Sequence, residues 1–293
     1  MASSWELASG AEIVPGRVAM DLLGSGLRYE TYLAWDEHLR ALVVAKLVRP
    51  DLVGDPGAMQ GIEAEARHLD RLAHPMLLRS FGAHLDGPRP HLVLEHIEGP
   101  RLSTLIRRFG LVVEQLLPLA LNLCAVLHYM SRERVVHLDV KPTNVIMAGA
   151  PRLIDLSVAR ELHELSGLTA PVGTDAYMAP EQCEPHRFGH IGPPADVWGL
   201  GATLYEALAR TRPFVEDGAR FPQLRGRPAA LPDSVPPALG ELVLPCLEHE
   251  PANRPTTTEL ADEFEPLVDS LPAPKIGKFR PGGSQMMRAL ENG

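Results

Sequence analysis

The first third of the chain alternates between short apolar runs and clusters of turn residues. β-Branched and aromatic residues are interrupted at Gly24–Gly26 and again at Asp36–His38, which indicates strands joined by turns. One segment instead repeats apolar residues at helical spacing and ends at His74-Pro75, because a residue before proline disfavours the helical conformation. The pattern predicts strands within residues 21–48, a helix over residues 58–73, and strands over residues 76–84 and 90–97.

Helical periodicity dominates the rest of the chain. Helices are predicted over residues 102–108, 114–133 and 196–210, near residues 237–248, and over residues 256–270. A β-rich part followed by a mostly helical part indicates an α+β architecture with two lobes. We therefore divide the chain into an N-terminal extension (1–14), a first lobe (15–97), a second lobe (98–271) and a flexible Pro/Gly-rich tail (272–293).

Composition and charge exclude several classes of protein. The 293 residues carry 28 Lys+Arg against 37 Asp+Glu, and a net charge of −9 argues against nucleic acid or an anionic membrane as partner. The longest apolar stretch, Leu111–Met130, contains several polar residues, and we interpret it as a buried helix. Three widely spaced cysteines and no recognisable signal peptide favour a reduced, cytoplasmic protein. The sequence does not indicate an oligomeric state.

Two features of the first lobe are compatible with phosphate binding. Leu23-Gly24-Ser25-Gly26 follows a predicted strand, and glycines let backbone N–H groups approach a phosphate, although a plain hairpin turn has the same composition. Lys46 ends an apolar strand and needs an anionic partner if it is buried. Glu65 on the following helix is the candidate for that partner. Each feature alone also has an ordinary structural explanation.

Two short loops in the second lobe carry a closely spaced polar group. The polar side chains of these loops can converge on one phosphoryl group, and they belong to Asp139, Lys141, Asn144 and Asp155. Asp139 could accept a proton, and Lys141 could neutralise developing negative charge. Asn144 and Asp155 offer the hard oxygen ligands that suit Mg²⁺.

Taken in order, these motifs resemble those of the eukaryotic-like (Hanks-type) serine/threonine protein kinases over about residues 15–270. Further matching segments are Gly173–Glu181, Asp196–Gly201 and Cys246–Pro255. The Ala/Arg/Pro-rich composition resembles that of a protein from a GC-rich bacterial genome. The resemblance implies the bilobal protein kinase fold, ATP and Mg²⁺ as cofactors, and protein substrates.

The resemblance also implies roles for individual residues. Lys46, oriented by Glu65, would bind the ATP phosphates beneath the glycine-rich loop, and Asp139 and Lys141 would act at the transferred phosphate. Asn144 and Asp155 would bind Mg²⁺. The adenine pocket would comprise Leu94 as gatekeeper, the Glu95 carbonyl, the Ile97 amide, and the side chains of Leu23, Thr31, Val44 and Ile146. Glu181 would pair with Arg254, and Asp196 would support the catalytic loop.

The chain departs from the family pattern at several positions. Tyr29 replaces the third glycine of the loop, Val44 replaces an alanine, and Ser157 replaces the glycine after the metal-binding aspartate. Leu138 replaces the arginine that usually binds an activation-segment phosphate, so we expect activity that does not depend strictly on phosphorylation there. A pseudokinase that acts as a nucleotide-binding scaffold is the alternative, and a small-molecule kinase is a weaker one.

Overall fold

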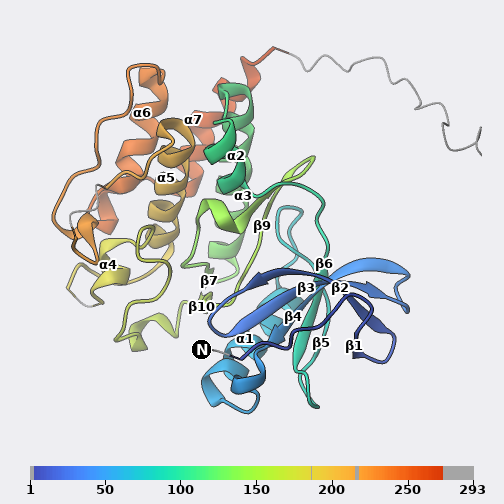
Figure 1. Cartoon of the computed structure of the whole chain (residues 1–293). Helices are drawn as coiled ribbons and strands as arrows, with labels where there is room; N and C mark the ends of the chain where they lie inside the picture. Colours follow the sequence, from blue (N-terminus) through green and yellow to red (C-terminus); the bar gives the residue numbers. More distant parts are fainter. Residues whose placement is uncertain (1–2, 186, 215–217, 273–293) are drawn as a thin grey trace, which may run out of the picture.

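A six-stranded antiparallel sheet and one long helix form the first lobe, in a computed structural model that describes residues 3–185, 187–214 and 218–272. The strand order is β1-β2-β3-β4-β6-β5, and helix α1 (Pro56–Arg71) lies against the sheet (Figure 1). The strands are β1 (Glu12–Val14), β2 (Arg17–Ser25), β3 (Tyr29–Asp36), β4 (Ala41–Val48), β5 (Ser80–His84) and β6 (His91–Glu95).

Alternation along β4 gives the sheet two different faces. Val43, Ala45 and Leu47 are fully buried in a small core on the outer face, where Trp5 and Leu7 of the N-terminal segment pack against them. Successive side chains of a strand point to opposite faces. Val44 and Lys46 therefore project from the other face, toward α1 and the second lobe.

Helix α1 begins and ends earlier than the sequence pattern predicted. Asp55 caps it by accepting a hydrogen bond of 2.8 Å from the Ala58 amide. The helix ends at Arg71 because Leu72 takes an extended conformation that buries its side chain in the core. Its buried stripe comprises Ala58, Ile62, Glu65, His68 and Leu69. Glu65 thus lies on the face turned toward the core.

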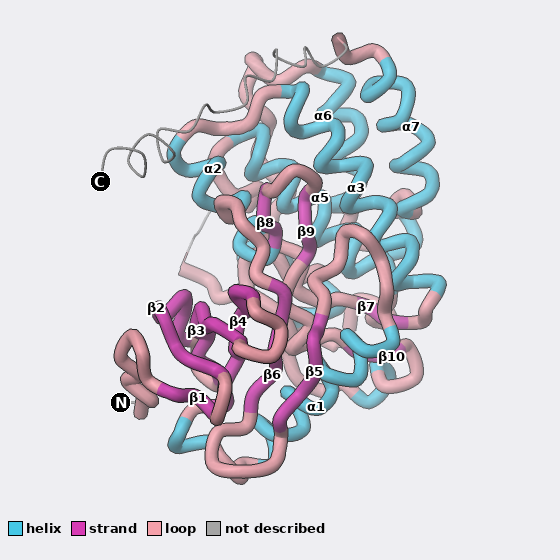
Figure 2. Tube along the Cα trace, turned by 90° about the vertical axis from the view of Figure 1, so that its right-hand side faces the viewer, coloured by secondary structure: helices cyan, strands magenta, loops and turns pink. Residues whose placement is uncertain are grey.

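The second lobe is mostly helical, and Figure 2 shows its helices stacked beyond the sheet. Helix α3 lies at its centre, packs against α7 and α5, and buries nine residues. By length and composition alone α3 could cross a membrane, but half of its apolar window is buried inside the protein, as in the core helix of a soluble domain. The helices are α2 (Leu102–Arg108), α3 (Val113–Arg132), α4 (Pro180–Cys183), α5 (Pro193–Ala209), α6 (Pro237–Val243) and α7 (Thr257–Asp269).

Two pairs of short strands in the second lobe lie on the side of that lobe that faces the first (Figure 2). They are β7 (Val135–Val136), β8 (Val145–Met147), β9 (Pro151–Leu153) and β10 (Arg160–Glu161). Before β5, the Leu78 amide donates to Leu153 O of β9, and the Leu153 amide donates to Met76 O. The predicted strand over residues 76–84 is therefore shorter, because residues 76–79 cross to the second lobe.

The α+β class and the two-lobed architecture that the sequence predicted are confirmed. Two helix boundaries differ from the prediction because of prolines. Helix α5 begins three residues early, with Pro193 at its first position. Helix α6 stops at Val243 and continues as a 3₁₀ turn, since Pro245 has no N–H for the next helical hydrogen bond. The predicted tail, from residue 273 on, lies outside the described residues.

Candidate active site

A cavity of about 290 Å³ lies between the two lobes. Nine of the fourteen residues that the sequence assigned to nucleotide binding line it, namely Leu23, Thr31, Val44, Lys46, Leu94, Glu95, Ile97, Ile146 and Asp155. The other five do not line it, and these are Gly24, Ser25, Gly26, Glu65 and Asn144. The strand register accounts for much of this wall, because Thr31 pairs with Lys46 and Val44 pairs with Leu94.

Five lining residues were not predicted, namely Leu78, His96, Gly99, Arg101 and Ile154. Ile154 directly precedes Asp155 and could have been found from that position. Leu78 reaches the cavity only because its segment crosses to β9, a tertiary contact without a local sequence signal. Gly99 is required by close packing, since a Cβ there would lie 2.6 Å from Met147 O.

Lys46 lies between two carboxylates that come from different lobes. Its Nζ donates to both oxygens of Glu65, at 2.9 and 2.7 Å, and to Asp155 Oδ1 at 2.9 Å. Lys46 is 8% exposed and Glu65 is fully buried, so each charge depends on its partner. The sequence predicted the Lys46–Glu65 pair, whereas contact with Asp155 joins the sheet to the second lobe.

The electrostatics of this group favour the charged forms of Lys46 and Asp155. Burial would lower the pKa of the Lys46 ammonium, but the Asp155 and Glu65 carboxylates raise it well above its usual value. Burial would raise the pKa of Asp155, and the Lys46 ammonium and hydrogen bonds from Ser157 hold it well below its usual range. Burial raises the pKa of Glu65, and Lys46 opposes that shift. Lys46 is therefore a fixed positive charge at the cavity wall.

Asp139 is the centre of a hydrogen-bonded cluster in the loop before β8. Its Oδ2 accepts hydrogen bonds from Lys141 Nζ at 2.6 Å and Asn144 Nδ2 at 3.0 Å, and its Oδ1 accepts one from Thr174 Oγ1 at 2.7 Å. Lys141 also donates to the Thr174 hydroxyl. The predicted loop residues thus lie together. A carboxylate beside an ammonium and a hydroxyl can bind another hydroxyl and accept its proton.

Buried contacts hold this loop in place. Asp196 of α5 accepts hydrogen bonds from the backbone amides of His137 and Leu138, at 2.7 and 2.8 Å. Leu138 has a φ of 64°, a left-handed conformation that is rare for such a side chain. Its carbonyl accepts a hydrogen bond of 2.8 Å from Gln182 Nε2, which also binds Val172 O. These contacts compensate the backbone strain, and they place the Leu138 side chain in the core.

A model of the protein kinase domain matches residues 18–264, which is most of the chain. The chain belongs to the protein kinase family. Its curated relatives include serine/threonine-protein kinase PknB of Mycobacterium leprae, which is 28% identical over 278 residues, covering 87% of this chain and 44% of the relative. The probable serine/threonine-protein kinase PkwA of Thermomonospora curvata is 32% identical over 286 residues, covering 92% of this chain and 38% of the relative.

PknB of Mycolicibacterium smegmatis is 29% identical over 253 residues, covering 80% of this chain and 40% of that kinase. The chain thus spans roughly two-fifths of the length of these relatives. The expected resemblance to bacterial Hanks-type kinases is confirmed. In this kinase domain, Lys46, Glu65, Asp139, Asn144 and Asp155 occupy the positions at which the family's motifs carry these residue types.

The hinge between the kinase lobes follows β6. Glu95, its last residue, forms an ion pair with Arg152 of β9 at 2.5 Å, which joins the lobes beside the cavity. The Ile97 amide has no hydrogen-bond acceptor among the described residues. It is therefore available to a ligand in the cavity. Leu94, which the sequence predicted as gatekeeper, lines the cavity and is 4% exposed.

The glycine-rich loop differs from the turn that the sequence predicted. Strand β2 continues through Gly24 and Ser25, which pair with Thr31 and Glu30 of β3, and the turn comes only after it. The Gly26 amide donates to Tyr29 O at 2.9 Å and closes that turn. The sequence pattern predicted that the strand ends at the first glycine, because two closely spaced glycines are typical of a turn. The pairing with β3 that extends the strand has no local sequence signal.

The kinase family implies Mg²⁺, and the oxygen atoms present fit that ion. Asn144 Oδ1 and Asp155 Oδ2 have no hydrogen-bond donor among the described residues, whereas Asn144 Nδ2 and Asp155 Oδ1 are already bonded. One carboxylate and one amide oxygen, completed by phosphate oxygens and water, are the kind of ligand set that Mg²⁺ uses. Within the described ranges, three or more His, Cys, Asp or Glu do not gather into a metal site.

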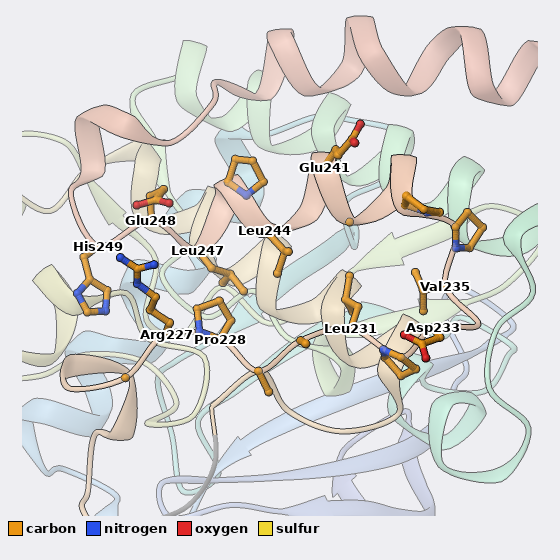
Figure 3. A pocket seen from close by; sticks show the side chains of 18 of the residues that line it. Arg227, Pro228, Leu231, Asp233, Val235, Glu241, Leu244, Leu247, Glu248 and His249 are labelled. Atoms are coloured by element: carbon orange, nitrogen blue, oxygen red, sulfur yellow. The ribbon is translucent and has the colours of Figure 1, made fainter.

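A larger cavity, of about 1320 Å³, lies elsewhere in the second lobe. It lies between α6 with the 3₁₀ turn after it and the proline-rich segment 225–237 (Figure 3). Leu231, Leu244 and Leu247 line its interior, while Arg227 and Glu248 lie toward one end. Because it lacks a convergent group of catalytic side chains, the smaller cavity between the lobes is the better candidate for the active site.

Proposed function

We propose that the protein is a serine/threonine protein kinase that transfers the γ-phosphate of ATP to hydroxyl groups of protein substrates. The observation that carries the proposal is the cluster of Asp139, Lys141, Asn144 and Thr174 in the loops next to the Lys46–Asp155 pair, which lies at the wall of the cavity between the lobes. The Ile154 amide donates to Asn144 O at 2.9 Å and so joins the two groups. Phosphoryl transfer needs mostly positioning and charge stabilisation from the protein. These side chains supply both.

In this reaction the substrate hydroxyl oxygen forms a bond to the γ-phosphorus, and the bond from that phosphorus to the β–γ bridging oxygen of ADP breaks. Asp139 orients the hydroxyl and accepts its proton, while Lys141 stabilises charge on the transferred group. Lys46 holds the α- and β-phosphates. Mg²⁺, held by Asn144 and Asp155, would shield the phosphate charge. Lys141 after Asp139, together with Thr174, resembles the serine/threonine branch of the family rather than the tyrosine branch, and the three side chains lie in contact.

A nucleotide-binding scaffold is the second candidate function. Val44 in place of alanine favours it, because it adds bulk at the wall of a cavity of about 290 Å³. Tyr29 in place of a loop glycine also favours it, since it removes the backbone freedom that glycine gives the loop. The complete set of chemical groups favours the enzyme. A cytoplasmic location, and no partnership with nucleic acid or membrane, stay predictions from charge and composition.

Incubation with labelled ATP and Mg²⁺ distinguishes the two functions. An active kinase labels itself or a general substrate such as casein or myelin basic protein, and Asp139→Asn abolishes labelling. Phosphoserine and phosphothreonine in the product support the acceptor class. If MgATP raises the unfolding temperature of the wild type but no phosphate is transferred, the protein is a nucleotide-binding scaffold.

A further inference from the structure

Tyr29 connects the glycine-rich loop to helix α1. Tyr29 is the first residue of β3, and the side chains of Glu30 and Tyr32 are buried on one face of that strand. Because side chains alternate along a strand, Tyr29 and Thr31 point to the other face, toward the cleft. The Tyr29 hydroxyl donates a hydrogen bond of 2.9 Å to the carbonyl of Ala58, in the first turn of α1. The residue that replaces a loop glycine thus contacts the helix that carries Glu65.

Helix α1 has room for this contact because of Gly61. A Cβ at position 61 would lie 2.5 Å from the Tyr29 hydroxyl oxygen, closer than side chains approach, but 3.8 Å from Tyr29 Cζ. Glycine in a helix interior is unfavourable relative to alanine, so its presence here needs a reason. The hydroxyl of Tyr29 supplies one.

The turn that precedes Tyr29 is also held in place. The Arg49 guanidinium donates to Ser25 Oγ and to Gly26 O, both at 2.8 Å, and the Gly26 amide donates to Tyr29 O. The turn before Tyr29 is therefore tied to Arg49, the residue directly after β4. The ring of Tyr29 lies 5.1 Å from Lys46 Nζ, measured to the ring centroid, so the same side chain covers the lysine.

We propose that Tyr29 is a positioning residue that holds α1 against the cleft and so keeps Glu65 within hydrogen-bonding distance of Lys46. Leu138 replaces the arginine through which an activation-segment phosphate usually orders the active site. The contact between Tyr29 and α1 instead orders the active site from within the first lobe. The inference rests on the proposed kinase function for its effect on activity. Its effect on α1 is independent of phosphoryl transfer.

Three variants test the contact. Tyr29→Phe removes the hydroxyl, and Gly61→Ala displaces it, so each should lower kcat/KM for ATP by roughly two- to tenfold, the range of one net hydrogen bond. The double variant should be no worse than either single one, because phenylalanine leaves only the 3.8 Å contact beside the new methyl group. Each single variant should also speed amide hydrogen exchange over residues 56–71.

Tyr32→Phe is the matched control. It removes a tyrosine hydroxyl bond from the same strand, the 3.1 Å contact with Glu30 Oε2, but on the face away from α1. It should leave exchange in α1 and the KM for ATP unchanged. Additive losses in the double variant, or wild-type exchange in Tyr29→Phe, would overturn the proposal.

Repeating the exchange measurements in the Asp139→Asn background separates this proposal from the proposed function. If the wild type transfers no phosphate but the exchange pattern holds, the kinase assignment fails and the role of Tyr29 stands. If transfer is robust and Gly61→Ala has no effect, the role of Tyr29 fails and the kinase assignment stands.

Discussion

Replacing Glu181 by glutamine should destabilise the second lobe severely. Glu181 and Arg254 form two parallel hydrogen bonds, at 2.6 and 2.8 Å, and both side chains are completely buried. The guanidinium also donates to three backbone carbonyls and lies 5.0 Å from the Trp198 ring centroid. Glu181→Gln leaves that cation buried with no carboxylate to neutralise it.

Removing one partner of a buried ion pair destabilises a protein by about 3–5 kcal/mol. The full burial and paired geometry of Glu181 and Arg254 place this variant in that range. With a urea m-value of about 3 kcal/mol per M, the unfolding midpoint should fall by about 1 to 1.7 M. Replacing both residues, as Glu181→Met with Arg254→Met, should destabilise less than the sum of the single changes, since neither charge is then left alone.

Equilibrium urea unfolding, followed by tryptophan fluorescence, measures both effects, because Trp198 lies against Arg254. The matched control is Glu161→Gln, which breaks an ion pair with Arg71 whose side chains are 35% and 41% exposed. That change should lower the stability by about 1 kcal/mol or less. A Glu181→Gln variant no less stable than this control would refute the reasoning.

Three more predictions follow from the site and the core. Phosphatase treatment should leave most of the activity, because Leu138 offers no cation to an activation-segment phosphate; complete loss in a peptide assay would contradict this. The stabilisation that Asp155 gains from Lys46 should be complete at neutral pH and begin to decline below about pH 4, because the pKa of Asp155 is lowered in the folded state. In urea unfolding, the stability difference between wild type and Asp155→Asn should therefore be smaller at pH 3 than at pH 7 without vanishing; a difference that grows on acidification would contradict this. All three cysteines are buried, which raises the pKa of each thiol to about 12, so mass spectrometry should find iodoacetamide adducts at pH 8 only after denaturation.

The sequence was informative where chemistry and periodicity coincide. Lys46, Glu65 and Asp155 could be assigned from an ordered set of motifs, and the structure brings them together. Helix α2 lies where its apolar spacing predicted. Boundaries set by tertiary contacts were missed, as at Leu72, which leaves the helix to bury its side chain.

The role of Tyr29 could not be read from the sequence. Its replacement of a loop glycine was visible, but the sequence did not indicate a partner for the added side chain. The hydroxyl reaches Ala58, and the space for it depends on Gly61, 32 residues further along the chain. A pairing of this kind needs the register of β3 and the orientation of α1, neither of which a local pattern supplies.

Two separate stretches of backbone join the lobes on the side of β9. One is the hinge after Glu95, with its ion pair to Arg152, and the other is the segment 76–79, which shares two backbone hydrogen bonds with β9. Two connections define a line, so the lobes can rotate about that line more easily than they can twist or slide. Widening of the cavity should therefore be greatest on the side away from β9, and nucleotide would enter and leave there.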